Sequence, residues 1–96
     1  MNLSYHKAVQ QEVEQACEWY DERKDRLGDE FFQEVERVLG LIATNPDAFP
    51  LAPFGRRKAR LKRFPYAICY RILADRVRIL SVRHDKRHPL YGTRRK

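Results

Sequence analysis

The sequence RLKRFPYAICYRILADRVRILSVR, residues 60–83, predicts the β-hairpin on which the rest of the fold is built. In residues 66–73 the apolar side chains return at every second position, which is the period of a β-strand. The short turn Ala74-Asp75-Arg76 leads into a second β-rich run over residues 77–82. Two such runs separated by a few turn residues favour an antiparallel hairpin.

The second strand of this hairpin has no clear inward face. Val77 and Ile79 are in phase with each other, and so are Leu80 and Val82, yet the two pairs have opposite phase. Either pair could point into a core. A central strand that is covered on both faces would show this pattern.

A basic run precedes the hairpin and has the same period of two. If residues 56–62 form a strand, Lys58, Arg60 and Lys62 project from one face, and Ala59 and Leu61 from the other. Such a row of cations has two interpretations. It is either a solvated strand face or a docking surface for a polyanionic or acidic partner, and the lack of acids in the row favours docking.

Two amphipathic helices are predicted ahead of this region, over residues 6–24 and 29–45. Leu27-Gly28 is expected to stop the first, and Asp29 is the N-cap of the second. Apolar residues at intervals of three and four form one stripe on each helix: Val9, Val13, Ala16, Cys17 and Tyr20 on the first, and Phe32, Val35, Val38, Leu39 and Ile42, flanked by Phe31, on the second. Residues 2–5 could make a short first strand, and the proline-rich residues 46–55 a loop.

These patterns predict an α+β fold in one domain over residues 1–96. An N-terminal helical hairpin packs on one face of a small antiparallel sheet, and residues 83–96 form a basic, partly irregular tail. Residues 1–55 contain 5 Lys/Arg and 11 Asp/Glu, a net charge of −6, whereas residues 56–96 contain 15 and 2, a net charge of +13. This separation indicates a surface built to meet something acidic or polyanionic.

Composition narrows the class of protein further. No run of about 18 apolar residues is present to span a membrane, and residues 1–7 lack the apolar core of a signal peptide, so we expect a cytoplasmic protein. Cys17 and Cys69 have no CxxC partner, and we expect two buried thiols. No motif indicates a metal or a cofactor, and we expect neither.

The order of these pieces resembles a known family. The residues that carry the resemblance are NPDAFP at 45–50, RLKRFPYAICYRI at 60–72, VRILSVRH at 77–84 and RHPLY at 87–91. Together they are similar to the RelE/ParE superfamily of toxins from bacterial type II toxin–antitoxin systems. The resemblance implies a toxin that causes growth arrest or plasmid stabilisation and is neutralised by a cognate antitoxin, whose acidic segment wraps around it.

The resemblance leaves the molecular target open. ParE-type toxins poison DNA gyrase, whereas RelE-type toxins cleave mRNA on the ribosome without a metal. The NPDAFP loop and the Arg63-Phe64-Pro65-Tyr66 approach to the long strand are closer to the ParE side, so gyrase poisoning is favoured and mRNA cleavage is the alternative. Whether the chain is an enzyme stays open with that choice. A third interpretation is a degenerate toxin or a non-toxic nucleic-acid-binding module.

A nuclease would need a base, an acid and cations around the scissile phosphate. By resemblance to the RelE type, Lys58 and Arg60 match its strand cations and Tyr91 its terminal tyrosine. Ala67 and Asp85 stand where that type has arginines, and these departures weaken the nuclease interpretation. Arg87, two positions after Asp85, is the tail cation included among the candidate catalytic residues. His84 is a weaker candidate for proton transfer. We assign binding of the target or the antitoxin to five other cations of this half: Lys62, Arg63, Arg71, Arg78 and Arg83.

Overall fold

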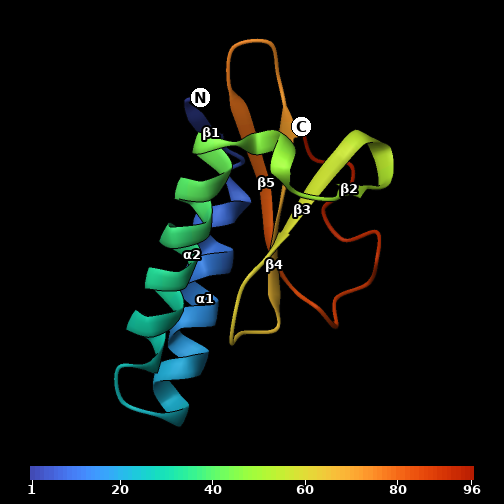
Figure 1. Cartoon of the computed structure of the whole chain (residues 1–96). Coiled ribbons are helices and arrows are strands. Elements are labelled where there is room, and N and C mark those ends of the chain that lie inside the picture. The colour runs from blue at the N-terminus through green and yellow to red at the C-terminus, as the bar shows by residue number, and fades with distance from the viewer.

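The computed structural model describes residues 1–96 and has two layers, a pair of antiparallel helices lying against one face of a five-stranded sheet (Figure 1). The helices are α1 (Ala8–Arg23) and α2 (Leu27–Thr44). The strands are β1 (Leu3–Tyr5), β2 (Leu51–Ala52), β3 (Arg56–Arg60), β4 (Tyr66–Ile72) and β5 (Val77–His84), with single 3₁₀ turns at Pro46–Ala48 and Pro53–Gly55. Neither helix is long and apolar enough to cross a membrane. The predicted α+β fold is confirmed.

The sheet is mixed, whereas an antiparallel sheet was expected. Its strand order is β1-β5-β4-β3-β2. β1 runs parallel to β5, with Leu3 opposite Val77 and Tyr5 opposite Ile79, and the other three pairings are antiparallel. A three-residue strand contains no signal for its direction. Here the helical hairpin carries the chain from one edge of the sheet to the other, which leaves β1 free to join β5 in parallel.

A β-bulge explains why the inward face of β5 was ambiguous. Ser81 pairs with Cys69 and Ile79 with Tyr70, so Leu80 is an extra residue between the two pairs. Val77, Ile79 and Val82 belong to the core under the helices. Leu80 and Ser81 are also buried, but they line the opposite face of the sheet. The strand is therefore covered on both faces, as its composition indicated.

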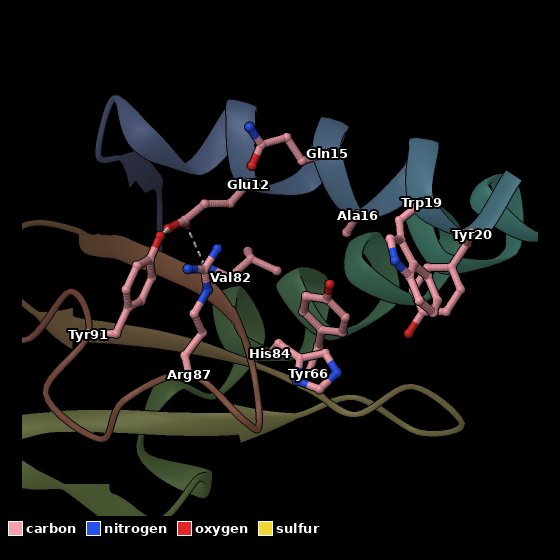
Figure 2. A pocket seen from close by; sticks show the side chains of 10 residues that line it. All are labelled: Glu12, Gln15, Ala16, Trp19, Tyr20, Tyr66, Val82, His84, Arg87 and Tyr91. Carbon is pink, nitrogen blue, oxygen red and sulfur yellow. Dashed lines mark hydrogen bonds between the residues drawn. The ribbon is translucent and has the colours of Figure 1, made fainter. Parts of the chain in front are cut away.

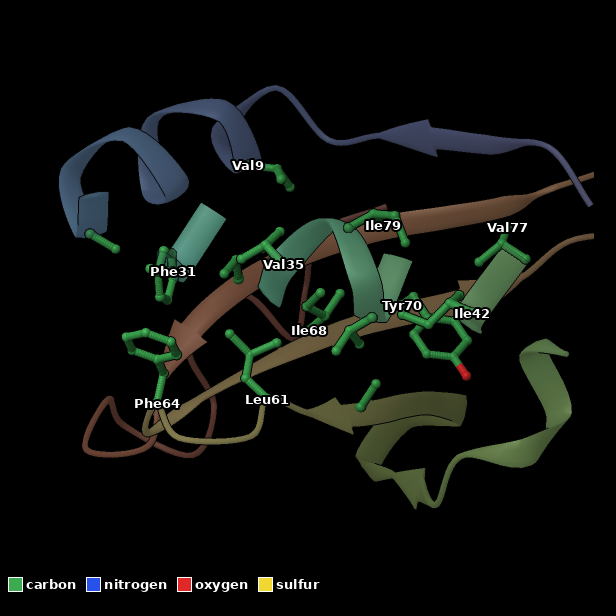
Figure 3. Close-up of a cluster of buried hydrophobic side chains, with 14 of the residues drawn as sticks. Val9, Phe31, Val35, Ile42, Leu61, Phe64, Ile68, Tyr70, Val77 and Ile79 are labelled. Atoms are coloured by element: carbon green, nitrogen blue, oxygen red, sulfur yellow. The ribbon is translucent and has the colours of Figure 1, made fainter. Parts of the chain in front are cut away.

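The core lies between the helices and the sheet and is filled by aromatic and branched side chains (Figure 3). Phe31, Val35, Val38 and Ile42 form the buried stripe of α2. The sequence placed Phe32 in this stripe with Phe31 beside it, and this detail was wrong, because Phe31 is fully buried and Phe32 is 46% exposed. The spacing of four from Phe31 to Val35 puts Phe31 on the sheet side.

The second helix begins at Leu27, two residues before the predicted N-cap Asp29. Gly28, expected to stop the first helix, lies inside α2, and its N–H donates to Asp21 Oδ1 at 2.7 Å. A Cβ on Gly28 would lie 2.5 Å from the carbonyl oxygen of Cys17. Glycine is therefore needed here because α1 and α2 approach each other closely, rather than as a helix stop.

The basic strand is shorter than predicted. β3 ends at Arg60, and residues 61–65 form a turn in which Leu61 and Phe64 fold back into the core. Lys62 is exposed in this turn, and its backbone N–H donates to Glu34 on α2. The predicted cation row Lys58–Arg60–Lys62 therefore loses its last member.

Candidate functional site

A row of cations projects from the sheet face that points away from the helices. In the register, Lys58 pairs with Cys69 and Arg60 with Ala67, and Arg83 also pairs with Ala67. Paired residues share a face, so Lys58, Arg60 and Arg83 lie on the same side. Their neighbours in sequence, such as Ala59 and Val82, belong to the core on the opposite side. Arg56, Arg71 and Arg78 extend this cationic outer face toward the far end of the strands.

The C-terminal tail, residues 85–96, folds over this face in a series of turns and encloses a cavity of about 340 Å³. Lys58, Arg83, Arg87 and Tyr91 line it together, although they are distant in sequence. The sheet supplies its floor through Cys69, Leu80 and Ser81. The structure thus brings together four of the residues that were predicted to bind or to act on a target.

Arg60, a predicted catalytic residue, pairs with an acid of the chain itself. One of its guanidinium nitrogens lies 2.5 Å from Asp85 Oδ2. Asp85, one of the two residues that depart from the RelE pattern, therefore ties β3 to the start of the tail. An arginine in this pair is less able to stabilise a developing phosphorane charge, because its own charge is already compensated.

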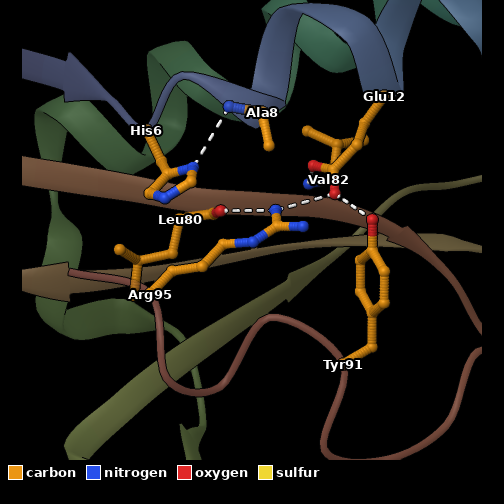
Figure 4. Close-up of polar contacts among 7 residues, drawn as sticks. All are labelled: His6, Ala8, Glu12, Leu80, Val82, Tyr91 and Arg95. Carbon is orange, nitrogen blue, oxygen red and sulfur yellow. Dashed lines mark hydrogen bonds and ion pairs between the residues drawn. The ribbon is translucent and has the colours of Figure 1, made fainter.

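Tyr91 is held by a carboxylate of α1 (Figure 4). Its hydroxyl donates to Glu12 Oε2 at 2.5 Å, and Arg95 donates to the same oxygen at 2.7 Å. The other oxygen of Glu12 accepts the N–H of Val82 at 3.0 Å. Arg95 also donates to the carbonyl of Leu80 at 3.0 Å. Glu12 therefore joins α1, β5 and the tail, and its side chain is only 10% exposed.

A second cavity, of about 310 Å³, lies between α1, the end of β5 and the tail (Figure 2). His84, Arg87 and Tyr91 line it from the sheet side, and Trp19 lines it from α1. His84 stacks edge-on against Tyr66 at 5.0 Å between ring centroids, and its Nδ1 accepts the N–H of Lys86. Its ring is thus positioned by packing and by one hydrogen bond, as a structural histidine is.

The remaining predicted binding residues lie in two other places. Arg63 is at the opposite side, where it pairs with Glu30 of α2 at 2.9 Å, and Lys62 is beside it. Arg78 donates to the carbonyl of Tyr5 at 2.9 Å. Arg71 of β4 lies directly opposite Arg78 of β5 in the strand register. No Asp or Glu of the chain pairs with Arg71 or Arg78. Lys62 and Arg63 therefore do not belong to the cationic outer face, whereas Arg71 and Arg78 do.

Three residues of this region were missed in the sequence: Glu12, Arg56 and Arg95. Glu12 had a signal, because it stands three residues after Val9 and four before Ala16, which places a carboxylate on the apolar side of α1. Arg56 and Arg95 had none. They are recognised only when the tail is seen to fold back, since Arg56 donates to the carbonyl of Arg95 at 3.0 Å.

The two cysteines are free and half-buried rather than fully buried. Burial raises the pKa of the Cys17 thiol, which keeps it protonated. The chain contains no group of three His, Cys, Asp or Glu side chains placed to hold a metal ion.

A family model describing the ParE toxin of type II toxin-antitoxin systems, parDE, matches residues 3–89. The chain belongs to this family. Among solved structures, the chromosomal ParDE toxin-antitoxin system from P. aeruginosa contains a chain that superposes on this ParE with a TM-score of 0.77. The two are 15% identical in sequence, and the match covers 88% of this chain and 95% of that one. At this identity the likeness shows that the fold is shared. A comparison with curated protein sequences found no match.

Proposed function

We propose that this ParE chain arrests growth by poisoning DNA gyrase in the cytoplasm and that a cognate antitoxin holds it inactive. The observation that carries the proposal is that several of the side chains needed for mRNA cleavage are either engaged within the chain or replaced. The hydroxyl of Tyr91 already donates a hydrogen bond to Glu12, and Arg60 is paired with Asp85. Ala67, fully buried, stands where a RelE-type toxin has an arginine.

A proton-transfer group must also reach the substrate, and two of the candidates in this ParE, Tyr91 and His84, are already engaged within the chain. The tyrosine hydroxyl would have to leave a carboxylate that also binds an arginine. His84 has one ring nitrogen occupied by the N–H of Lys86. Poisoning of gyrase by a bound protein needs no acid or base from the toxin, so the engaged state of Tyr91 and His84 is compatible with it.

The alternative target is supported by one feature of the cavity on the cationic outer face. Lys58 has no acidic partner, and the buried Nε of Arg83 has no hydrogen-bond acceptor within the chain. Two unpaired cations beside Tyr91 would suit a phosphate of RNA. For this reason ribosome-dependent cleavage stays as the second candidate.

Charge supports an acidic antitoxin. The chain has a net charge of +7, and Arg71 lies opposite Arg78 in the hairpin with no carboxylate between them. An acidic antitoxin segment placed there would relieve this repulsion. Arg71→Glu should therefore weaken antitoxin binding without affecting folding, and an unchanged affinity would remove this part of the proposal.

The test compares both targets with the same protein. Expression of the toxin alone should arrest growth, and co-expression of the antitoxin should restore it. The purified toxin should inhibit supercoiling by purified gyrase, and toeprints on translating ribosomes should show no new cuts. Arg60→Ala should stay toxic. Codon-site cuts that disappear in Arg60→Ala, together with uninhibited gyrase, would transfer the function to the ribosome.

A further inference from the structure

The tip of the loop between β2 and β3 displays an aromatic side chain on a strained backbone. Phe54 has φ 63° and ψ 32°, the left-handed helical region, which a bulky residue rarely adopts. Burial of the side chain does not offset this strain, because Phe54 is 66% exposed. Strain of this kind persists where the surrounding structure enforces it, and it is concentrated at functional sites.

One arginine enforces this conformation. Arg56 donates to the carbonyl of Phe54 at 2.8 Å through one guanidinium nitrogen. Through the other it donates to the carbonyl of Arg95 at 3.0 Å. Burial lowers the pKa of Arg56, in keeping with its place between the loop and the tail. The loop is therefore fastened to the tail, and Phe54 is held outward rather than left free to fold down.

The surroundings of Phe54 are apolar and cationic. Leu90, which is 57% exposed, lines the same shallow groove of about 650 Å³. The groove is otherwise bordered by His6 and by tail residues that include Arg94 and Lys96, and no acidic side chain lines it. In Figure 1 this loop lies at the sheet edge farthest from the helices. An exposed aromatic anchor with a cationic rim is the pattern of a protein-binding hot spot that fits an acidic partner.

We propose that the Phe54 loop, residues 53–55, inserts into an apolar cleft with an acidic rim on the enzyme that this ParE poisons. The inference rests on the proposed function, since it names the toxin surface used there. Shape favours the enzyme over the antitoxin. A projecting rigid loop fits a concave site on a folded protein.

The decisive variant is Phe54→Gly. Glycine adopts the left-handed region without strain, so this variant should fold and its melting temperature should rise by roughly 2–6 °C. It also removes the anchor, so the concentration needed to inhibit gyrase supercoiling should rise at least about tenfold. Phe32→Ala is the matched control. It removes another exposed phenylalanine, 46% exposed on α2, and should leave inhibition unchanged.

Three results would overturn the inference. The first is inhibition of gyrase by Phe54→Gly at the wild-type concentration. The second is a variant that still inhibits gyrase but no longer binds the antitoxin, which would assign the loop to the antitoxin. The third is undiminished growth arrest by Phe54→Gly in the case where the wild type does not inhibit gyrase. Such a failure of the wild type contradicts the proposed function alone, and relief of growth arrest by Phe54→Gly would then support the inference.

Discussion

The replacement Glu12→Gln tests whether a single carboxylate fastens the tail to the body of the protein. Glutamine has the same shape but no charge, and it offers one acceptor oxygen in place of two. Glu12 now accepts from Tyr91, Arg95 and the N–H of Val82. The amide group of glutamine would direct N–H donors at one of these donors, and Arg95 would lose its counter-ion.

The expected loss follows from the contacts. A hydrogen bond that involves a charged group contributes about 1.5–3 kcal/mol, and breaking a buried ion pair costs about 3–5 kcal/mol. The side chains of Glu12 and Arg95 are 10% and 18% exposed, so water offsets part of this cost. We expect the free energy of unfolding to fall by about 2–4 kcal/mol, a large part of the 5–15 kcal/mol typical of a domain.

Urea unfolding measures the loss in the free energy of unfolding directly, and two local measurements show whether the tail has been released. Trypsin should cleave after Arg87 and Arg94 faster in Glu12→Gln, and the amide of Val82 should exchange faster with solvent. Glu14→Gln is the matched control, because Glu14 is exposed and accepts only from Gln10. The reasoning is refuted if Glu12→Gln unfolds within 0.5 kcal/mol of the wild type, about the scatter of surface substitutions.

Two further predictions concern the core. Gly28→Ala should destabilise the protein by about 1–3 kcal/mol, because its Cβ would lie 2.5 Å from the carbonyl of Cys17. Gly40→Ala, whose Cβ meets nothing within 4 Å, should stabilise the protein by about 1 kcal/mol. Equal effects of the two variants in urea unfolding would contradict the close approach of the helices. Burial raises the pKa of Tyr70 from 10.0 to about 12. The folded state therefore favours the neutral phenol, and stability should be level below pH 10 and then fall by about 1.4 kcal/mol per pH unit up to pH 12. Tyr70→Phe should remove this alkaline component and cost about 1 kcal/mol at pH 7, because the carbonyl of Pro46 loses its donor; an unchanged pH profile would count against it.

Periodicity was sufficient to predict the layers of the fold from sequence. The alternation in residues 66–73 and the helical stripe containing Val35, Val38 and Ile42 both indicate a face that packs on the core, and both elements formed within two residues of their predicted bounds. What failed was local. Phe31 and Phe32 are adjacent aromatics, and only tertiary packing decides which of them turns inward. The same is true of Gly28, whose role depends on the approach of the other helix.

The candidate site was less accessible to sequence reasoning, because it depends on the tail folding back. Lys58, Arg83 and Tyr91 could be selected as cations and an aromatic, and the structure places them around one cavity. Their states could not be foreseen, since each depends on a partner distant in sequence. Arg60 is separated by 25 residues from Asp85, and Tyr91 by 79 from Glu12.

The most direct test of the account is to measure gyrase-dependent DNA breaks. Supercoiled plasmid is incubated with purified gyrase and this ParE, and the reaction is stopped with detergent and protease to release any broken DNA. The account predicts linear plasmid only when both proteins are present, and the same amount with Arg60→Ala. Intact plasmid in every reaction, with mRNA cut on ribosomes by the same preparation, would contradict it.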